Sequence, residues 1–362
     1  MQNRISALNK LLPFVSIGTI ADAQSVLEPC NRLLIKAGIQ VINNSKTYYG
    51  LESLIQELGL REKMSTGYQI DSQDMAFLFS PILNASGRIS HANISINTLI
   101  QNPSNQQTNL AKDLIQINTD RKNIVKEYTV SLDAEVKKQL ESQNKMIWLV
   151  GDWNKGVVGL IASRIQNQVN LPVAVISIGE ENLSGSFRAP NGYNLPNALE
   201  ECKDLLIKFG GHPQAAGFTF LETNLDELKS KLDQYFSNSN SFNLTTDPNQ
   251  VRKINLNISE INTDLLEELL NLDPFGIDFP TPIICIDQKD IVNLKMQEMS
   301  LGKHFKLILN NIDLIFFNLS QEQRNDILNS KNKSLILEFN IGKNYWKGKQ
   351  SYQLIYQKYS ES

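Results

Sequence analysis

The stretch Phe209-Gly210-Gly211-His212-Pro213-Gln214-Ala215-Ala216-Gly217 is the pattern that decides the fold of this chain. Two glycines precede one of only three histidines, and small residues follow in a run that a helix can accommodate. Glycine lets a backbone approach a ligand closely, and a helix that starts after such a loop offers unpaired N–H groups to an anion. We therefore expect Gly210 and Gly211 to hold a phosphate, with His212 as a hydrogen-bond donor or general acid. The alternative is a Gly-Gly turn whose histidine caps the next helix.

Composition places the chain among globular proteins of two or three domains. It has 362 residues, of which 41% are hydrophobic and 20% are charged. Its three cysteines lack metal-binding spacing, which predicts reduced thiols and a cytoplasmic location. No run of 18 apolar residues occurs, so we expect no membrane partner. The net charge of −3 argues against a generic nucleic-acid coat, but residues 281–359 are mildly basic, as in a strand-binding module.

Hydrophobic periodicity predicts a helix-rich first part. Phe14–Gly18 is predicted to be a strand and Asn31–Gly38 a short helix, and residues 49–100 are helical in pattern. Residues 108–140 keep a spacing of three to four between apolar positions and contain no Gly or Pro. They predict one long helix that connects two lobes; the alternatives are a plain core helix or two helices broken near Tyr128.

The second part alternates strands and helices, which implies a layered α/β sheet. Strands are predicted at 146–150 and 173–178, and helices at 157–166 and 198–209. Residues 237–248 are polar and predict a loop. Five further short strands favour a small barrel of the OB type; they are predicted at 283–286, 305–309, 314–317, 335–339 and 352–356.

Two short motifs near the start carry groups suited to ligands. Asp22 ends Gly18-Thr19-Ile20-Ala21-Asp22 and would follow a strand, where α/β folds place binding groups. A lone Asp there is also a common helix cap. Asn84 and Arg88 flank three small residues, and a guanidinium can bind a phosphate with two hydrogen bonds. The alternative for Arg88 is a surface ion pair at a helix end.

Three later motifs point to phosphate and to single strands. Residues 151–159, which include Asn154, follow a strand and open a helix but lack the ending of a nucleotide-binding P-loop. Gly185, Ser186 and Arg188 would follow a strand and form either a pocket for a terminal phosphate or an ordinary β-turn. Near the C-terminus, basic groups mix with aromatic rings, as single-strand binding requires, although aromatics in strands are often core; the candidates are His304, Lys306 and Trp346.

Taken in this order, the motifs resemble those of the RecJ single-stranded-DNA exonucleases in the DHH phosphoesterase superfamily. The matching pieces are 18–22, 31–32, 83–88, 152–164, 185–188, 209–218, 273–276 and 304–309. The resemblance implies an α/β chain built from four parts. These are a remnant of the DHH catalytic domain at 1–105, a connecting helix at 106–145, a DHHA1 substrate-binding domain at 146–235, and an OB-type β-barrel with its lead-in at 250–362.

The resemblance also implies a 5′–3′ exonuclease of DNA repair and recombination that uses Mn²⁺ or Mg²⁺. Asp22 matches the last metal-binding motif, and Arg88 matches an arginine near the DNA path. Ser186 and Arg188 match the pocket for the 5′ phosphate. His212, with Gly210 and Gly211, matches the DHHA1 signature that faces the active site.

Two departures from the family pattern bear on activity. Asn154 stands where relatives usually carry His, and the earlier metal motifs, including Asp-His-His, do not occur. We expect a chain that is inactive alone and that depends on upstream residues or a complementing N-terminal chain. One alternative is a non-catalytic single-strand-binding or replisome-associated relative. Another is a phosphoesterase of short oligonucleotides.

Overall fold

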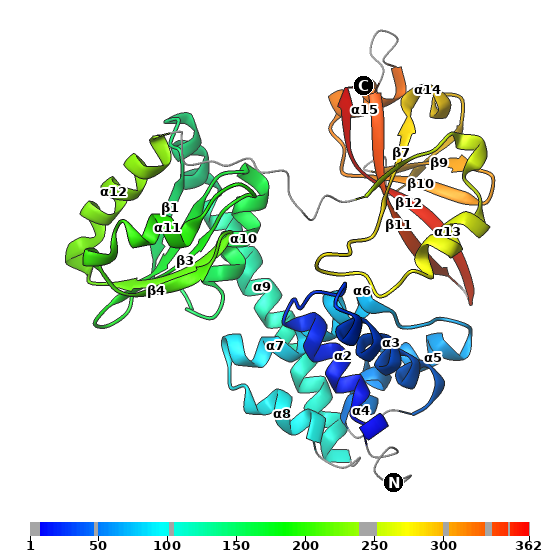
Figure 1. The fold of residues 1–362 in the computed structure, drawn as a ribbon, viewed down its shortest axis with the longest axis horizontal. Coiled ribbons are helices and arrows are strands. Elements are labelled where there is room, and N and C mark those ends of the chain that lie inside the picture. The colour runs from blue at the N-terminus through cyan, green and yellow to red at the C-terminus, as the bar shows by residue number, and fades with distance from the viewer. Residues whose placement is uncertain are drawn as a thin grey trace. The chain divides into compact units, whose positions relative to one another are not determined.

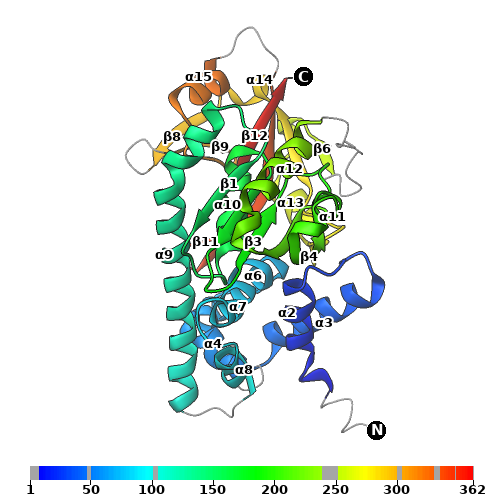
Figure 2. The ribbon, with the colours of Figure 1, turned by 90° about the vertical axis from the view of Figure 1, so that its left-hand side faces the viewer.

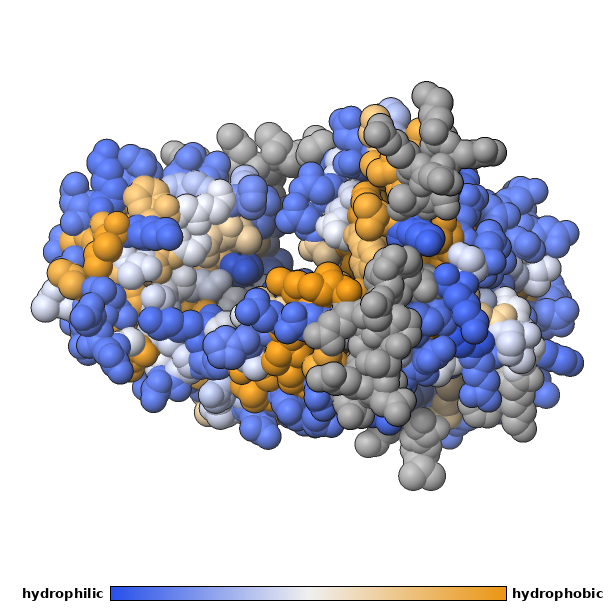
Figure 3. Space-filling model, turned by 90° about the horizontal axis from the view of Figure 1, so that it is seen from below, coloured by the Kyte–Doolittle hydropathy of each residue, from blue (hydrophilic) through white to orange (hydrophobic). Residues whose placement is uncertain are grey.

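The computed structural model describes residues 8–46, 50–100, 105–238, 252–299, 304–329, 335–346 and 348–361 (Figure 1). The chain forms two compact units. The first unit contains Met1–Ser80 and Pro248–Ser362, and the second contains Pro81–Asp247. Hydrophilic residues cover most of the face shown in Figure 3, with apolar residues in smaller patches. No helix among these described residues is long and apolar enough to cross a bilayer.

The first unit opens with helices. They are α2 (Leu12–Ala21), α3 (Pro29–Asn44), α4 (Gly50–Glu57), α5 (Leu60–Ser65) and α6 (Ser72–Asp74), followed by a π-helical turn (Met75–Phe79). The strand predicted at Phe14–Gly18 is wrong, because these residues belong to α2. Pro13 lies in the first turn of that helix, where proline is tolerated, and a short apolar run fits a helix as well as a strand. The predicted helix at Asn31–Gly38 is confirmed as part of the longer α3.

The first unit ends in a seven-stranded sheet of the OB type. Its order is β6-β7-β11-β12-β10-β9-β8, with parallel pairs at β6–β7 and β10–β12. The strands are β6 (Lys253–Asn255), β7 (Ile283–Asp287), β8 (Lys295–Met299), β9 (His304–Leu309), β10 (Ile312–Phe317), β11 (Leu335–Trp346) and β12 (Lys349–Glu361). The helices beside them are α13 (Thr263–Leu270), α14 (Gln288–Ile291) and α15 (Gln321–Asn329). All five predicted strands are confirmed, whereas β6 and β8 were not predicted.

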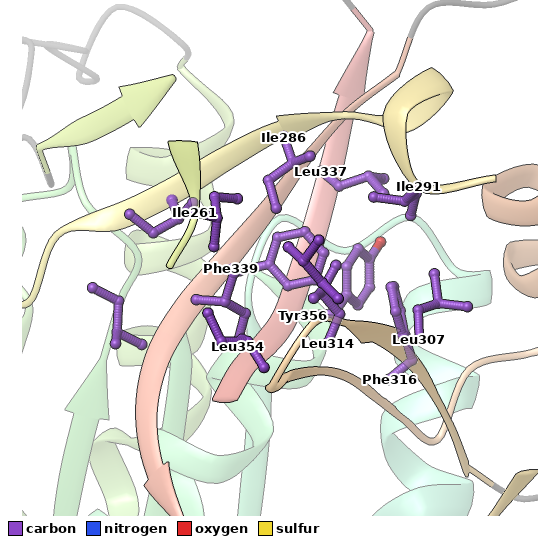
Figure 4. Packing of buried hydrophobic residues seen from close by; sticks show 14 of the residues in the cluster. Ile261, Ile286, Ile291, Leu307, Leu314, Phe316, Leu337, Phe339, Leu354 and Tyr356 are labelled. Carbon is purple, nitrogen blue, oxygen red and sulfur yellow. The ribbon is translucent and has the colours of Figure 1, made fainter. Parts of the chain in front are cut away.

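Aromatic rings form the centre of this sheet's core. Phe316 of β10, Phe339 of β11 and Tyr356 of β12 are buried and in mutual contact, with ring centroids 5.1 to 6.0 Å apart (Figure 4). Aromatic pairs at such distances stabilise a core beyond their burial alone. Three strands are thereby fixed to one another through side chains as well as through their backbone hydrogen bonds.

A polar joint fastens the segment before this sheet to the helices of the same unit. Arg32 on α3 donates one hydrogen bond of 2.9 Å to the Pro274 carbonyl and another to the Leu272 carbonyl. The Ser72 hydroxyl donates to Asp273 and accepts from the Phe275 N–H. The motif residues Arg32 and Asp273 therefore hold the fold together within the first unit.

The second unit is a five-stranded sheet with helices. The sheet has the order β1-β2-β3-β5-β4, with β1 (Ile147–Gly151), β2 (Val173–Ser177), β3 (Leu183–Arg188), β4 (Leu206–His212) and β5 (Ala215–Phe220). The helices are α7 (Ser80–Ile89), α8 (Asn93–Ile100), α9 (Asn105–Glu141), α10 (Val158–Val169), α11 (Leu195–Glu200) and α12 (Leu225–Ser237). Only β1 and β2 pair in parallel; the other neighbours are antiparallel.

The predicted long helix is confirmed as α9, whose 37 residues run without interruption (Figure 2). It belongs to the second unit and packs against α10 through Ile124 and Val125. The Gln139 side chain donates to the Trp148 carbonyl and accepts from the Trp148 N–H, at 2.7 and 2.9 Å, so it bonds the outer side of edge strand β1. A connecting role for α9 stays a prediction.

The helix predicted at 198–209 is wrong, and so is the expected helix after the glycine loop. After the short α11 the chain enters β4, and Gly210-Gly211-His212 are part of this strand, which forms a hairpin with β5. Gly211 has φ of +151°, and a Cβ there would lie 2.3 Å from the Ala215 carbonyl oxygen. Glycine is therefore required for close pairing of the two strands of this hairpin.

Candidate phosphate-binding site

The turn from β1 into α10 has the predicted geometry of a strand followed by a helix N-terminus. The Asn154 side-chain oxygen accepts a 2.8 Å hydrogen bond from the Gly156 N–H, and its carbonyl accepts one of 3.0 Å from Val157. These bonds close a turn of the kind that Asn favours. The first turn of α10 carries no acidic residue, so no carboxylate in that turn offsets the positive end of the helix dipole.

The end of α7 lies directly against this turn. Arg88 donates from Nη1 to the Gly156 carbonyl oxygen over 3.2 Å. A Cβ on Gly156 would lie 1.8 Å from the Arg88 carbonyl oxygen, so the two backbones touch. Asn84, one turn earlier on α7, is exposed. The absence of a side chain at Gly156 thus positions the Arg88 guanidinium at the start of α10.

Ser186 and Arg188 come from β3 rather than from a loop after a strand, which corrects their expected setting. They alternate with the buried Phe187 and therefore share one face of the sheet. Arg188 Nη1 donates to Ser186 Oγ over 2.9 Å. A Cβ on Gly159, in the first turn of α10, would lie 2.9 Å from Arg188 Nη2 and 3.0 Å from Ser186 Oγ. Gly185 instead lies under the Phe218 ring on the other face.

The sheet register aligns the glycine-histidine motif with these two residues. Arg188 pairs with Ala215, which pairs with His212, and Ser186 pairs with Gly217, which pairs with Gly210. Directly paired residues point to the same face of a sheet. The predicted residues Ser186, Arg188, Gly210 and His212 therefore share one face, within about 10 Å across three strands.

A third arginine, which no sequence motif marks, joins the site. Arg121 on α9 has a pKa lowered first by burial and then by the charge of Arg88, and the same two causes lower the pKa of Arg188. Along the part of the chain that the structure describes, no carboxylate oxygen lies within 4.0 Å of the charged nitrogens of Arg88, Arg121 or Arg188. We call these three residues the arginine cluster. It concentrates positive charge without internal compensation, as an anion site requires.

The candidate metal ligand Asp22 lies in the first unit at the C-terminal end of α2, because the strand expected before it is a helix. It is exposed, and its carboxylate accepts a 2.8 Å hydrogen bond from Gln24. Among the residues with described positions, no three His, Cys, Asp or Glu side chains gather as a metal site would need. These residues therefore do not fit a two-cation centre, and the role of Asp22 as a metal ligand stays a prediction.

The candidate DNA-binding residues of the C-terminal sheet have mixed surroundings. His304 Nδ1 accepts a hydrogen bond from the Asn318 N–H over 3.1 Å, and its ring meets Phe317 edge to face. Lys306 forms a 2.7 Å ion pair with Asp313, which offsets its charge. The Trp346 side chain lies outside the described residues. Strand binding by this sheet stays a prediction.

Comparison with known proteins gives a domain match for each sheet. Residues 143–238 match the DHHA1 domain model, and residues 254–358 match the model of the RecJ OB domain. The chain carries a DHHA1 domain and a RecJ OB domain. Both were expected from the motifs, and the resemblance to RecJ is confirmed.

Single-stranded-DNA-specific exonucleases named RecJ are similar over much of the chain. The Bacillus subtilis protein is 29% identical over 96% of this chain and 43% of its own length, and the Escherichia coli protein is 29% identical over 77% and 49%. A crystal structure of Thermus thermophilus RecJ in complex with Mn²⁺ has the same fold, with a TM-score of 0.76 and 21% identity over 98% of this chain and 50% of that one. The chain thus spans about half the length of these relatives.

Proposed function

We propose that this chain binds the 5′-phosphorylated end of single-stranded DNA and serves a RecJ-like 5′–3′ exonuclease of DNA repair and recombination in the cytoplasm. The observation that carries the proposal is the meeting of Ser186, Arg188 and Arg88 at the N-terminus of α10. A terminal phosphate is a dianion with several acceptor oxygens. Guanidinium forks, a hydroxyl and a helix N-terminus each recognise such a group.

The same face of the sheet offers room for the nucleotide that follows the phosphate. A Cβ on Gly210 would meet no atom within 4 Å, and one on Gly217 would meet only the Gly185 carbonyl oxygen at 3.9 Å. The row Ser186–Gly217–Gly210 is therefore a backbone surface open to a sugar or base. His212, one row along on the same face, can donate a hydrogen bond to a bound strand.

Hydrolysis needs divalent cations, which would activate water and stabilise the leaving oxygen. Because the described residues do not group the required ligands, we propose that Mn²⁺ or Mg²⁺ is held by carboxylates and imidazoles outside these residues, including those of a complementing chain. In that arrangement the arginine cluster and Ser186 bind and orient the strand end. Asn154 cannot act as a general acid or base, since an amide does not titrate.

The first test replaces Arg188. Arg188→Gln is expected to weaken binding of a 5′-phosphorylated oligothymidine by about tenfold to a hundredfold, since a hydrogen bond to a charged group contributes about 1.5–3 kcal/mol. Binding of the same strand with a 5′ hydroxyl should change by less than twofold. Fluorescence anisotropy of the two strands measures both effects, with Lys137→Gln as a control that removes an exposed charge from α9 of the same unit. Equal affinity of the wild-type chain for both strands would contradict the proposal.

A second test fills the open row. Gly217→Val is expected to keep or raise the melting temperature, because nothing obstructs its Cβ and β-branched residues favour strands. The valine side chain should keep the DNA from contacting the backbone at this row. Loss of that contact should weaken oligonucleotide binding by about tenfold. Calorimetry and anisotropy on one preparation separate the two effects. If Gly217→Val is stable and binds the oligonucleotide with unchanged affinity, the DNA does not pass over this row.

A non-catalytic binding role is the second candidate, favoured by the lack of a metal-ligand group among the described residues. The two candidates differ in one assay. The chain is mixed with a polypeptide that carries the Asp-His-His ligands, and Mn²⁺-dependent release of nucleotides is measured. Release of nucleotides by the mixture, but by neither polypeptide separately, supports the exonuclease. Binding of DNA by the mixture without release of nucleotides supports the binding role. The match of residues 254–358 to the RecJ OB domain argues against a phosphoesterase that acts solely on short oligonucleotides.

A further inference from the structure

Arg121 occupies an unusual position for a helix arginine. It shares the inward stripe of α9 with Ile124, Val125 and Tyr128, at the spacing of one helix face. Tyr128 stacks on Trp153 with ring centroids 5.9 Å apart, next to the Asn154 turn. The stripe therefore directs Arg121 to the side of α9 where α10 begins.

The hydrogen bonds of Arg121 are incomplete. Its Nη2 donates to Asn118 Oδ1 over 2.7 Å, but its Nε is buried and has no partner among the described residues. A buried donor left unpaired costs free energy, and a like charge beside it adds to that cost. Neither cost is offset by a carboxylate in the described part of the chain. Both would be relieved by an anion.

The charge of the cluster indicates more than one anion. Arg88 is bonded to the turn that follows Trp153, and the stripe that carries Arg121 stacks on Trp153 through Tyr128. The charge of Arg88 also lowers the pKa of both Arg121 and Arg188. Three guanidinium groups carry three positive charges. A terminal phosphate together with the next phosphodiester carries about three negative charges and matches them. A terminal phosphate alone carries fewer.

We propose that Arg121 is a specificity-determining residue that binds, with Arg88, the first internucleotide phosphodiester of the strand whose 5′ phosphate occupies Ser186 and Arg188. This rests on the proposed function, because it presumes that the strand end lies on β3. The site then measures two successive phosphates and favours a polynucleotide end over a mononucleotide. Arg121 acts by contact with substrate and takes no part in bond cleavage.

The test uses two ligands that differ by one phosphodiester, thymidine 5′-monophosphate and the 5′-phosphorylated dinucleotide pTpT. Isothermal titration is carried out on the wild-type chain, on Arg121→Gln and on Arg188→Gln. Arg121→Gln should weaken pTpT binding about tenfold and leave the mononucleotide within twofold. Arg188→Gln should weaken both. Lys122→Gln, which removes an exposed charge from the adjacent position of α9, should change neither.

The melting temperature without ligand shows whether a variant that loses affinity is still folded. Arg121→Gln should melt at the wild-type temperature or a few degrees higher, because it removes an uncompensated charge, and Arg121→Lys should restore part of the pTpT affinity. A wild-type chain that binds neither ligand overturns the proposed function together with this inference. A wild-type chain that binds both, with Arg121→Gln weakening both equally or neither, overturns the inference alone.

Discussion

Replacing Gly156 with alanine is expected to destabilise the second unit by about 3 kcal/mol and to abolish binding of the 5′-phosphorylated strand. The new Cβ would lie 1.8 Å from the carbonyl oxygen of Arg88 and 2.6 Å from its carbonyl carbon. Both are backbone atoms, so no side-chain rotation relieves the overlap, and overpacking of this kind costs about 1–3 kcal/mol or more. The turn and the end of α7 must separate, which removes the Arg88 hydrogen bond to Gly156.

Gly87 provides the matched control, because it adjoins Arg88 in α7. A Cβ there would meet the Ala92 methyl group at 3.6 Å, an ordinary contact. Gly87→Ala should therefore be neutral or stabilising by up to about 1 kcal/mol, as for glycine in a helix, and should bind the strand normally. Urea unfolding and anisotropy give both quantities. A Gly156→Ala chain with wild-type stability and affinity would refute the close packing that defines the site.

Replacing Asp74 with asparagine is expected to stabilise the first unit by up to about 3 kcal/mol above pH 6. The Asp74 carboxylate accepts hydrogen bonds from the Tyr68 hydroxyl at 2.6 Å and from the Asp71 N–H at 3.2 Å. Burial, and then the nearby Asp71 carboxylate, raise the pKa of Asp74 to about 6, although Lys343 on β11 partly opposes this. Burial also raises the pKa of Asp273 in the adjoining polar joint.

The linkage between protonation and folding sets the direction in which stability changes with pH. Because the folded-state pKa of Asp74 lies above its ordinary value of 3.8, folding favours the protonated carboxyl. Its contribution to stability is fully present below about pH 4 and is lost as the pH rises through about 6. A rise of the pKa from 3.8 to about 6 corresponds to about 3 kcal/mol. Asparagine keeps both acceptor contacts and carries no charge, so the loss between pH 4 and 6 should disappear.

Urea unfolding from pH 4 to pH 8 measures this effect. Asp278→Asn serves as the control, because Asp278 is exposed in the same unit and has a left-handed backbone that asparagine also adopts readily. The control should follow the wild-type profile. If the free energy of unfolding of Asp74→Asn falls between pH 4 and 6 as steeply as that of the wild type, Asp74 is not the group responsible.

Local pattern in the sequence was sufficient wherever an element is long or strongly periodic. The apolar spacing between residues 108 and 140 identified α9, and the β1–α10 turn was found with its strand and helix. The prediction for Phe14–Gly18 failed because three apolar residues within five positions have no resolvable period. The prediction for the stretch at 209–217 failed because its small residues fit a helix as well as a hairpin, and the pairing of β5 with β3 depends on residues 183–188, which are distant in sequence. Exposed, polar strands such as β8 carry no hydrophobic signal.

The candidate site was predicted in pieces but not as a whole. Arg88, Asn154, Ser186 and Arg188 each belong to a short motif, so the sequence marks them. Their convergence depends on the contact of Gly156 with α7 and of Gly159 with β3, which no local pattern contains. Arg121 was missed because a single arginine in a helical pattern resembles any solvated side chain, and only its inward stripe with Val125 distinguishes it.

The two margins of the five-stranded sheet differ, because at β1 the side chain of Gln139 imitates the main chain of an additional strand. An incoming polypeptide would have to displace this amide before it could extend the sheet there. At the opposite margin, β4 is bonded to β5 alone among the described strands. A polypeptide that added a strand to this sheet would meet an occupied edge at β1, whereas the edge at β4, which carries His212, has no neighbour among the described strands.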